Sequence, residues 1–108
     1  MVGTETDAAA IAPLADERRR TVLRRLREYG MPMTLADLAD EVVGSENDEP
    51  RPGRSCDEVA RVAARLHHVD LPKLAEAGFL SYDLRTNVVR LSERGETFDR
   101  EPISAVTP

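Results

Sequence analysis

The pattern of hydrophobic and polar residues changes its period along the chain, and each period predicts a different kind of element. Apolar residues recur at helical spacing in three stretches, near 16–29, 34–44 and 55–77. Apolar and polar residues then alternate over 79–82, and a second apolar run covers 88–91. Two short runs of this kind, separated by a few polar residues, are typical of a β-hairpin. The pattern predicts an α+β fold of three helices followed by a two-stranded hairpin.

The apolar stripes of these elements define a candidate core. Only two Tyr, two Phe and no Trp are present, so we expect the core to consist mainly of Leu, Val and Ala. The residues expected to be buried are Val22, Leu23, Leu26, Tyr29, Leu35, Leu38, Ala39, Val42, Val59, Val62, Ala63, Leu66, Leu71, Leu74, Leu80 and Leu91.

Residues suited to helix ends mark the boundaries of the predicted helices. Asp16, Thr34 and Ser55 stand where helices begin, and their side-chain oxygens can accept hydrogen bonds from the free N–H groups of a first turn. Gly30 and Gly78 follow the first and third helices, where a left-handed residue commonly closes a helix. These five residues predict the helix ends independently of the apolar pattern.

The remaining segments carry little apolar periodicity. We expect residues 1–14 and 93–108 to be flexible, on either side of one domain over 15–92. Residues 44–54 hold two Pro and two Gly with alternating charges, which predicts irregular structure between the second and third helices. We expect Met33, in the connector before the second helix, to pair briefly with the hairpin.

Pro72 interrupts the third helix. Proline lacks a backbone donor, and its ring crowds the carbonyl of His68, which costs roughly 3 kcal/mol inside a regular helix. Two interpretations remain open: a continuous helix kinked near 68–72, or a break in which Asp70 caps a short helix over 71–77. We favour the kink.

The charge balance is acidic but uneven in type. Twenty acids oppose fifteen bases, and Lys73 is the only lysine among those bases. An acidic, lysine-poor, Ala- and Val-rich chain resembles proteins from salt-loving archaea. The net charge of −5 argues against unselective binding to nucleic acid, although it leaves room for a local basic face.

Several classes of protein are disfavoured by the sequence. No apolar run approaches the roughly 18 residues of a membrane span, and no signal-peptide pattern opens the chain. The single Cys56 has no partner for an internal disulfide. We therefore expect a cytoplasmic protein that makes no membrane contact.

Catalysis and metal binding are also disfavoured. Adjacent histidines on a helix point about 100° apart, and Cys56 lies about 16 Å along the helix from His67. Neither a Gly-rich phosphate loop nor a serine nucleophile elbow is present. We expect no enzymatic activity, no cofactor and no metal site, with His67 half-buried beside Leu66 as a structural residue.

The polar stripe of the third helix carries the functional hypothesis. Arg61, Arg65, His68 and Pro72 recur one helical turn apart, opposite the apolar stripe. Such cations can reach phosphates or the acceptor edge of guanine in a DNA major groove. Charged stripes on small helices are more often ordinary solvated faces, so the spacing alone leaves both interpretations open.

Three segments carry a resemblance to a known family: ERRRTVLRRLREYG, LADLADEV and RLHHVDLPKLAEAGFLSYD. Together they resemble the winged helix-turn-helix domains common in haloarchaea. More distantly, LPKLAEAGFLSYD is similar to the helix-to-wing junction of ArsR-like and MarR-like transcription regulators. The resemblance covers about residues 14–92 and implies a wing at 83–87.

The chain departs from that family in three respects. The connection 44–54 is longer than the usual turn between the last two helices, and its Glu46, Asp48 and Glu49 would repel a phosphate backbone. The long C-terminal helix through which many such regulators dimerise is missing. The paired Cys or His ligands of metal-sensing ArsR-like proteins are missing as well.

The combined hypothesis is a DNA-binding transcriptional regulator with the third helix in the major groove and the wing on the backbone. We expect a homodimer that uses the first helix and residues 1–14, bound to double-stranded DNA. The predicted DNA-binding residues are Arg54, Arg61, Arg65, His68, Lys73 and Arg85. The alternative is a winged-helix module that binds protein partners, first through the acidic face of Asp37, Asp40 and Glu41. A sensor with a ligand between subunits is a third possibility.

Overall fold

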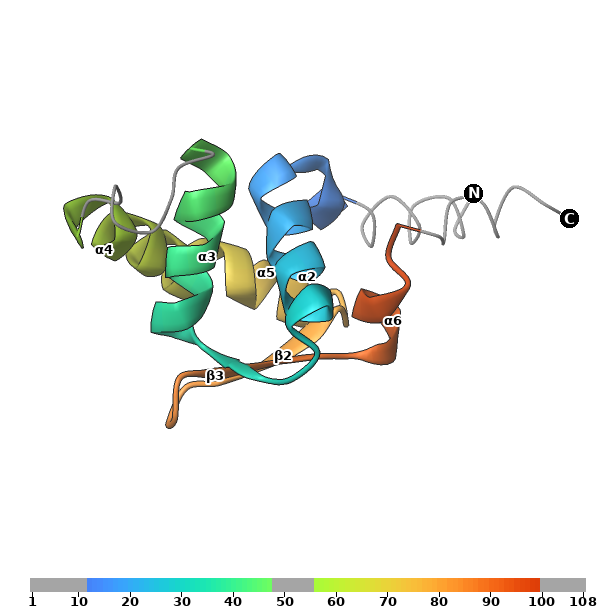
Figure 1. Ribbon diagram of the computed structural model, residues 1–108. Helices are drawn as coiled ribbons and strands as arrows, with labels where there is room; N and C mark the ends of the chain where they lie inside the picture. Colours follow the sequence, from blue (N-terminus) through green and yellow to red (C-terminus); the bar gives the residue numbers. More distant parts are fainter. Residues whose placement is uncertain (1–11, 48–55, 100–108) are drawn as a thin grey trace, which may run out of the picture.

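The computed structural model describes residues 12–47 and 56–99. Helices lie on one side of a small antiparallel sheet, whose hairpin projects beyond them (Figure 1). The described elements, in chain order, are η1 (Ala12–Ala15), α2 (Glu17–Tyr29), β1 (Met33–Thr34), α3 (Leu35–Asn47), α4 (Cys56–Arg65), η3 (Leu66–Asp70), α5 (Leu71–Glu76), β2 (Leu80–Asp83), β3 (Val88–Leu91) and α6 (Glu93–Glu96).

Helix α2 begins and ends where its capping residues predicted. The Asp16 carboxylate accepts a hydrogen bond from the Arg18 amide at 2.8 Å, which satisfies one free donor of the first turn. Gly30 adopts a left-handed φ of 79°, and its amide donates to the Leu26 carbonyl at 3.1 Å. The predicted boundaries of this helix are confirmed.

The sheet has three strands, in the order β1-β3-β2, instead of the two of the predicted hairpin. Met33 pairs with Val89, so the expected pairing of the connector with the hairpin is confirmed. The added strand is only two residues long, which is too short to produce an alternating pattern in the sequence. The fold is therefore α+β with a small antiparallel sheet.

Helix α3 is longer than predicted. Its start is confirmed, because the Thr34 hydroxyl accepts a hydrogen bond from the Asp37 amide at 3.2 Å. The helix continues through Gly44 to Asn47, so the irregular structure expected from residue 44 is wrong for 44–47. Val43 and Gly44 are buried there, and tertiary packing offsets the low helix propensity of glycine. The rest of that connection, with Arg54 and Ser55, lies outside the described residues.

The third predicted helix is continuous through Pro72, with one wide turn. Asp70 and Leu71 keep right-handed helical angles, and the Leu71 amide donates to the carbonyl of Leu66, five residues back. This π-helical turn, η3, widens the backbone next to Pro72, which has no amide to donate. The interpretation with a break is wrong, because Asp70 makes no capping hydrogen bond.

The end of α5 forms a Schellman motif. The Gly78 amide donates to the Ala75 carbonyl and the Phe79 amide to the Leu74 carbonyl, both at 3.0 Å. Gly78 has a φ of 87°, as its predicted role requires. The chain then turns directly into β2, with Phe79 buried against the core.

One continuous core joins the helices to the sheet. Most predicted core residues are buried, whereas Leu35, Val59, Ala63 and Leu91 are only partly buried. Tyr29 was expected in the core, but it is 52% exposed. The fully or nearly buried apolar residues are Val22, Leu23, Leu26, Met33, Leu38, Ala39, Val42, Val43, Val62, Leu66, Leu71, Leu74, Phe79, Leu80, Val89 and Phe98.

The C-terminal segment is ordered further than expected. A flexible tail was predicted from residue 93, but Ser92 caps the short helix α6 through a hydrogen bond from the Gly95 amide. Phe98 then enters the core with 2% exposure. Gly95 packs so closely that an added Cβ would lie 2.1 Å from the Phe79 carbonyl oxygen. The prediction of a flexible tail is wrong for 93–99.

At the N-terminal end, a flexible segment was predicted over 1–14, and this prediction is wrong for residues 12–14. Ala12–Ala15 form a 3-10 turn, in which Pro13 is buried and Leu14 packs against the core. Within the described residues, no helix has the length and apolar character needed to cross a membrane.

Candidate nucleic-acid interface

The six arginines of α2 all bind groups within the protein. Arg18 pairs with Glu46, Arg19 with Asp70, Arg25 with Glu28, and Arg27 with Asp99. Arg20 donates to the Leu14 carbonyl and Arg24 to the Thr21 hydroxyl. The basic face of α2 is therefore largely neutralised or hydrogen-bonded by the fold itself.

The bases that follow α3 differ from those of α2 in having fewer partners within the described residues. Five of them have exposed side chains that form neither an ion pair nor a hydrogen bond with any described residue. These bases, named the unpaired bases below, are Arg61, Arg65, Lys73, Arg85 and Arg90. The predicted exposure of the first four, and of His68, is confirmed. An external anion would compete with no internal partner for these five side chains.

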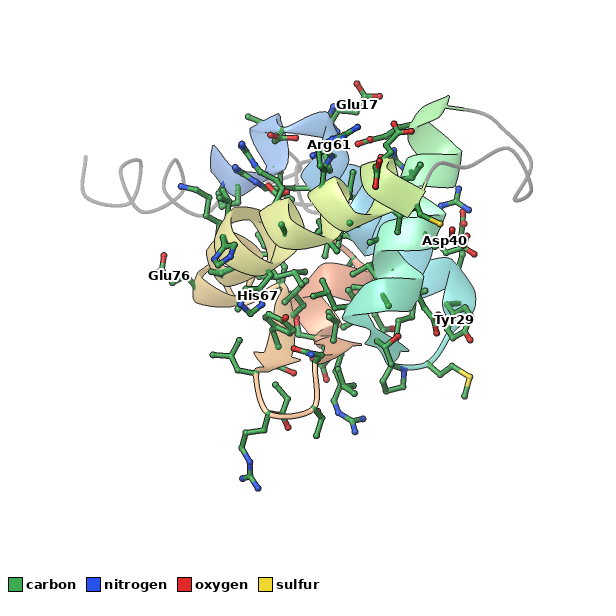
Figure 2. All side chains as sticks on the ribbon, turned by 90° about the vertical axis from the view of Figure 1, so that its left-hand side faces the viewer. Glu17, Tyr29, Asp40, Arg61, His67 and Glu76 are labelled. Atoms are coloured by element: carbon green, nitrogen blue, oxygen red, sulfur yellow. The ribbon has the colours of Figure 1, made fainter. Side chains whose placement is uncertain are left out.

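The unpaired bases come from α4, α5 and the hairpin. Arg61 lies on the upper side of α4, toward Glu17, whereas His67 lies on the lower side, toward the sheet (Figure 2). Arg85 belongs to the hairpin turn, below α4 in the same view. Arg61 and the hairpin turn that carries Arg85 therefore lie on opposite sides of α4 in this view.

Arg65 lies beside α2. It lines a hollow of about 270 Å³ together with Asp16, Arg18, Glu46 and Asp70. Glu46 and Asp70 in this hollow are already paired with Arg18 and Arg19, and neither forms an ion pair with Arg65, so Arg65 is placed to contact a bound anion from the side. It is not suited to deep insertion into a groove.

Two small side chains, those of Ala60 and Ala64, are exposed on α4. A helix that presents alanine can approach another surface more closely than one covered by long side chains. His68 is exposed on the next turn of the same face, which gives this region a polar edge.

Below α4, His67 connects the helix to the sheet. Its Nδ1 lies 2.7 Å from the Tyr82 hydroxyl, which in turn donates to Asn87 Oδ1 at 3.3 Å. The half-buried position expected for His67 is confirmed. Burial raises the pKa of the Tyr82 phenol above its ordinary value of 10.0.

The two adjacent histidines of η3 are in contact. Their rings, of His67 and His68, meet edge to face with centroids 4.7 Å apart. The described residues nevertheless contain no group of three or more His, Cys, Asp or Glu side chains able to hold a metal ion.

The acidic groups near this interface are partly neutralised. Glu46 was expected to repel phosphate, but it accepts two hydrogen bonds from Arg18 at 2.6 and 3.0 Å. This pairing raises the pKa of Arg18. Asp40 and Glu41 were expected to be exposed, but they are half-buried, and only Asp37 of that face is exposed.

Asp70 is the one charged side chain among the buried residues of the described chain. It is 1% exposed, and its Oδ1 accepts a hydrogen bond from Arg19 Nε at 3.0 Å. Its Oδ2 is buried without a hydrogen-bond partner among the described groups. This ion pair ties η3 to α2 and thereby fixes the orientation of the helix that carries Arg61 and Arg65.

An apolar patch lies at the end of α2, next to a hollow that the unpaired base Arg90 also lines. Tyr29, the last residue of α2, is 52% exposed, and Met31, in the connector to β1, is 61% exposed. Beside them, a hollow of about 390 Å³ is lined in part by Met31, Pro32 and Leu91. No hydrophobic stripe of the sequence predicted this patch, because it forms where a helix end meets a loop.

Sequence reasoning missed two features of the interface. Arg90 is an unpaired base, and the alternation of β3 around the buried Val89 would have indicated its outward direction. The contact between His67 and Tyr82 joins residues fifteen positions apart, and no local pattern predicts it. Of the predicted set, Arg54 lies outside the described residues.

Comparison with known proteins gives a family without a described activity. No curated protein and no solved structure matches this chain. The family described as "Domain of unknown function (DUF7344)" matches residues 12–90, from the turn η1 to strand β3. This match covers all five unpaired bases, the hairpin up to Arg90 and most of the core, and the chain therefore belongs to the DUF7344 family.

Proposed function

We propose that this domain is a winged helix that binds duplex DNA as a transcriptional regulator. In this proposal α4 enters the major groove, and the turn between β2 and β3 is the wing that meets the backbone. The observation that carries the proposal is the contrast between the paired arginines of α2 and the unpaired bases of α4, α5 and the hairpin.

The order of the elements supports the winged-helix assignment. A helix, a short strand, two further helices and a hairpin follow one another, and the short strand β1 pairs with β3 of the hairpin. The resemblance to haloarchaeal winged-helix domains, and distantly to ArsR-like and MarR-like regulators, belongs to the same proposal. A regulator of this kind would act in the cytoplasm.

The separation of the unpaired bases favours a helix held in a groove. The major groove is about 12 Å wide and has a phosphate backbone on each side. Arg61 and Arg65 lie on one side of α4, and the wing with Arg85 lies on the other. Each group can therefore meet a different backbone, while Ala60 and Ala64 let the helix approach the bases.

Salt-dependent binding to genomic DNA fragments tests this proposal. Each phosphate neutralised by Lys or Arg contributes about one unit to the slope of log affinity against log salt. We expect a steep slope in the parent protein and a flatter one in Arg85→Ala. We also expect some fragments to bind more tightly than others at equal salt. A parent protein that binds no fragment at low salt would refute the proposal.

A homodimer is part of the same proposal, because two half-sites need two copies of α4. The exposed side chain of Tyr29 makes the end of α2 the first candidate for the dimer surface. Light scattering in molar salt should give twice the 12.0 kDa mass of one chain at micromolar protein. A strictly monomeric mass under those conditions would overturn this part.

A module that binds protein partners is the second candidate function. The exposed Tyr29 and Met31 beside a hollow favour it, since aromatic residues and methionine are enriched at protein interfaces. The acidic face first expected for this role is reduced to Asp37 by the burial of its neighbours. This candidate takes precedence if DNA binding is absent while Tyr29→Ala abolishes self-association.

A further inference from the structure

A chain of three side chains joins the proposed recognition helix to the proposed wing. His67 Nδ1 lies 2.7 Å from the Tyr82 hydroxyl, and that hydroxyl donates to Asn87 Oδ1 at 3.3 Å. The rings of His67 and Tyr82 also meet edge to face, with their centroids 5.7 Å apart. One hydroxyl group thus links helix η3, strand β2 and the last residue of the hairpin turn.

The last residue of this chain holds the wing in place through its backbone as well. Asn87 has a left-handed φ of 59°, which asparagine tolerates better than most residues. Its amide donates to the Asp83 carbonyl at 2.7 Å, and its carbonyl accepts from the Leu35 amide at 2.8 Å. A change in the position of Asn87 would therefore move both the turn that carries Arg85 and the start of α3.

We propose that the Tyr82 hydroxyl is a positioning group that sets the angle between helix and wing. With the wing held in this way, Arg85 reaches the phosphate backbone when α4 lies in the groove. This inference rests on the proposed DNA-binding function. Tyr82 touches no DNA in this account; it acts through His67 and Asn87.

The hydrogen-bond chain also fixes the tautomer of His67. A hydroxyl group has one proton and can donate it to only one acceptor. Since Tyr82 donates to Asn87, both bonds exist together only if His67 Nδ1 carries a proton and donates to Tyr82. Neutral His67 should therefore be the Nδ1–H tautomer, and nitrogen-15 NMR of the ring distinguishes this form from the other.

A double-mutant cycle on DNA affinity tests the positioning role. In the parent protein, Arg85→Ala should flatten the slope of log affinity against log salt by about one unit. In the Tyr82→Phe background, the same substitution should flatten this slope by less than half a unit. Ser81→Ala is the matched control, because it removes an exposed hydroxyl from the same strand. In the Ser81→Ala background, Arg85→Ala should have its full effect. An equal effect of Arg85→Ala in both backgrounds would overturn the proposal.

A second readout does not depend on DNA. In Tyr82→Phe, the amides of Asn87 and Leu35 should exchange with solvent faster than in the parent, whereas the amides of α2 should keep their rates. The Nδ1–H tautomer signal of His67 should weaken in the same variant. Unchanged exchange at both amides would overturn the positioning role even if DNA binds. If the parent binds no DNA, the proposed function fails, and amide exchange alone decides whether Tyr82 holds the hairpin.

Discussion

Helix α2 and the surface formed by α4 and the hairpin are both rich in arginine, yet they use it differently. Every arginine of α2 has a partner in the fold, and the partners come from η1, η3, α3 and the C-terminal segment as well as from α2 itself. Among the described residues, the side chains of Arg61, Arg65 and Arg85 have no such partner. The first set holds the domain together, and the second set remains available to an external anion.

This contrast shows how to interpret an arginine-rich, acidic chain. The number of bases says little about the ability to bind an anion, because about half of the described bases already have partners within the protein. What matters is whether a carboxylate or carbonyl lies within reach of each guanidinium. On this criterion the candidate interface is confined to α4, α5 and the hairpin.

The largest expected effect concerns the buried ion pair that ties η3 to α2. Asp70→Ala removes the nearer of two carboxylates from the Arg19 guanidinium, which is only 12% exposed and keeps just the Asp16 carboxylate at 4.0 Å. Breaking such a pair costs roughly 3–5 kcal/mol, which urea denaturation measures. Glu76→Ala, which removes an exposed carboxylate from α5, is the control and should change stability by less than about 0.5 kcal/mol. Equal losses in the two variants would contradict a structural role for this pair.

The next effect tests the register of the helix that carries the unpaired bases. Leu66 is fully buried, and Leu66→Ala should cost roughly 2–5 kcal/mol in the free energy of unfolding. Leu84→Ala makes the same chemical change at a side chain that is 67% exposed in the hairpin turn. This second variant should be nearly neutral. If Leu84→Ala destabilised the protein as much as Leu66→Ala, the assigned face of the helix would be wrong.

A smaller effect is expected at the partly exposed pair of Arg18 and Glu46. Its side chains are 31% and 28% exposed, so solvent and salt weaken the attraction between them. Arg18→Ala should cost about 0.2–1 kcal/mol, and less in concentrated salt. Arg61→Ala, which breaks no internal pair, should leave thermal stability unchanged. If Arg61→Ala destabilised the protein more than Arg18→Ala, the assignment of α2 arginines to the fold and of Arg61 to the free surface would be contradicted.

The smallest effect concerns the pH dependence of Tyr82. Burial raises the pKa of its phenol above 10.0, so the folded state favours the neutral form more than the unfolded state does. The associated stability is fully present below pH 10 and is lost as the pH rises through the folded-state pKa. In the Tyr29→Phe variant, ultraviolet absorbance should show the single phenolate appearing with a midpoint above 10.0. A midpoint at or below that value would show that Tyr82 is not buried as described.

The sequence predicted the helices well, because their signals are local. Asp16, Thr34, Gly30 and Gly78 act within one turn of their own position, and the apolar stripes repeat over several turns. The exposure of most candidate DNA-binding residues follows from the same periodicity. Each of these features depends on neighbours that are close in the sequence.

The features that escaped prediction depend on residues far apart in the chain. Asp70 lies 51 positions from Arg19, so its burial in an ion pair has no local signal. Phe98 is a single apolar anchor without periodic neighbours, and a pattern of helix or strand does not reveal it. Tyr29 continued the stripe of α2, but it lies in the last turn of the helix, where it is exposed at the edge of the molecule (Figure 2).

The central claim is that the unpaired bases, and not the arginines of α2, hold DNA. The most direct test compares Arg61→Ala/Arg65→Ala with Arg20→Ala/Arg24→Ala, because both double variants lower the net charge by two. Salt-titrated DNA binding should show a slope flatter by about two units in the first variant and a nearly parental slope in the second. A parental slope in the first variant, or the same loss in both, would contradict the account.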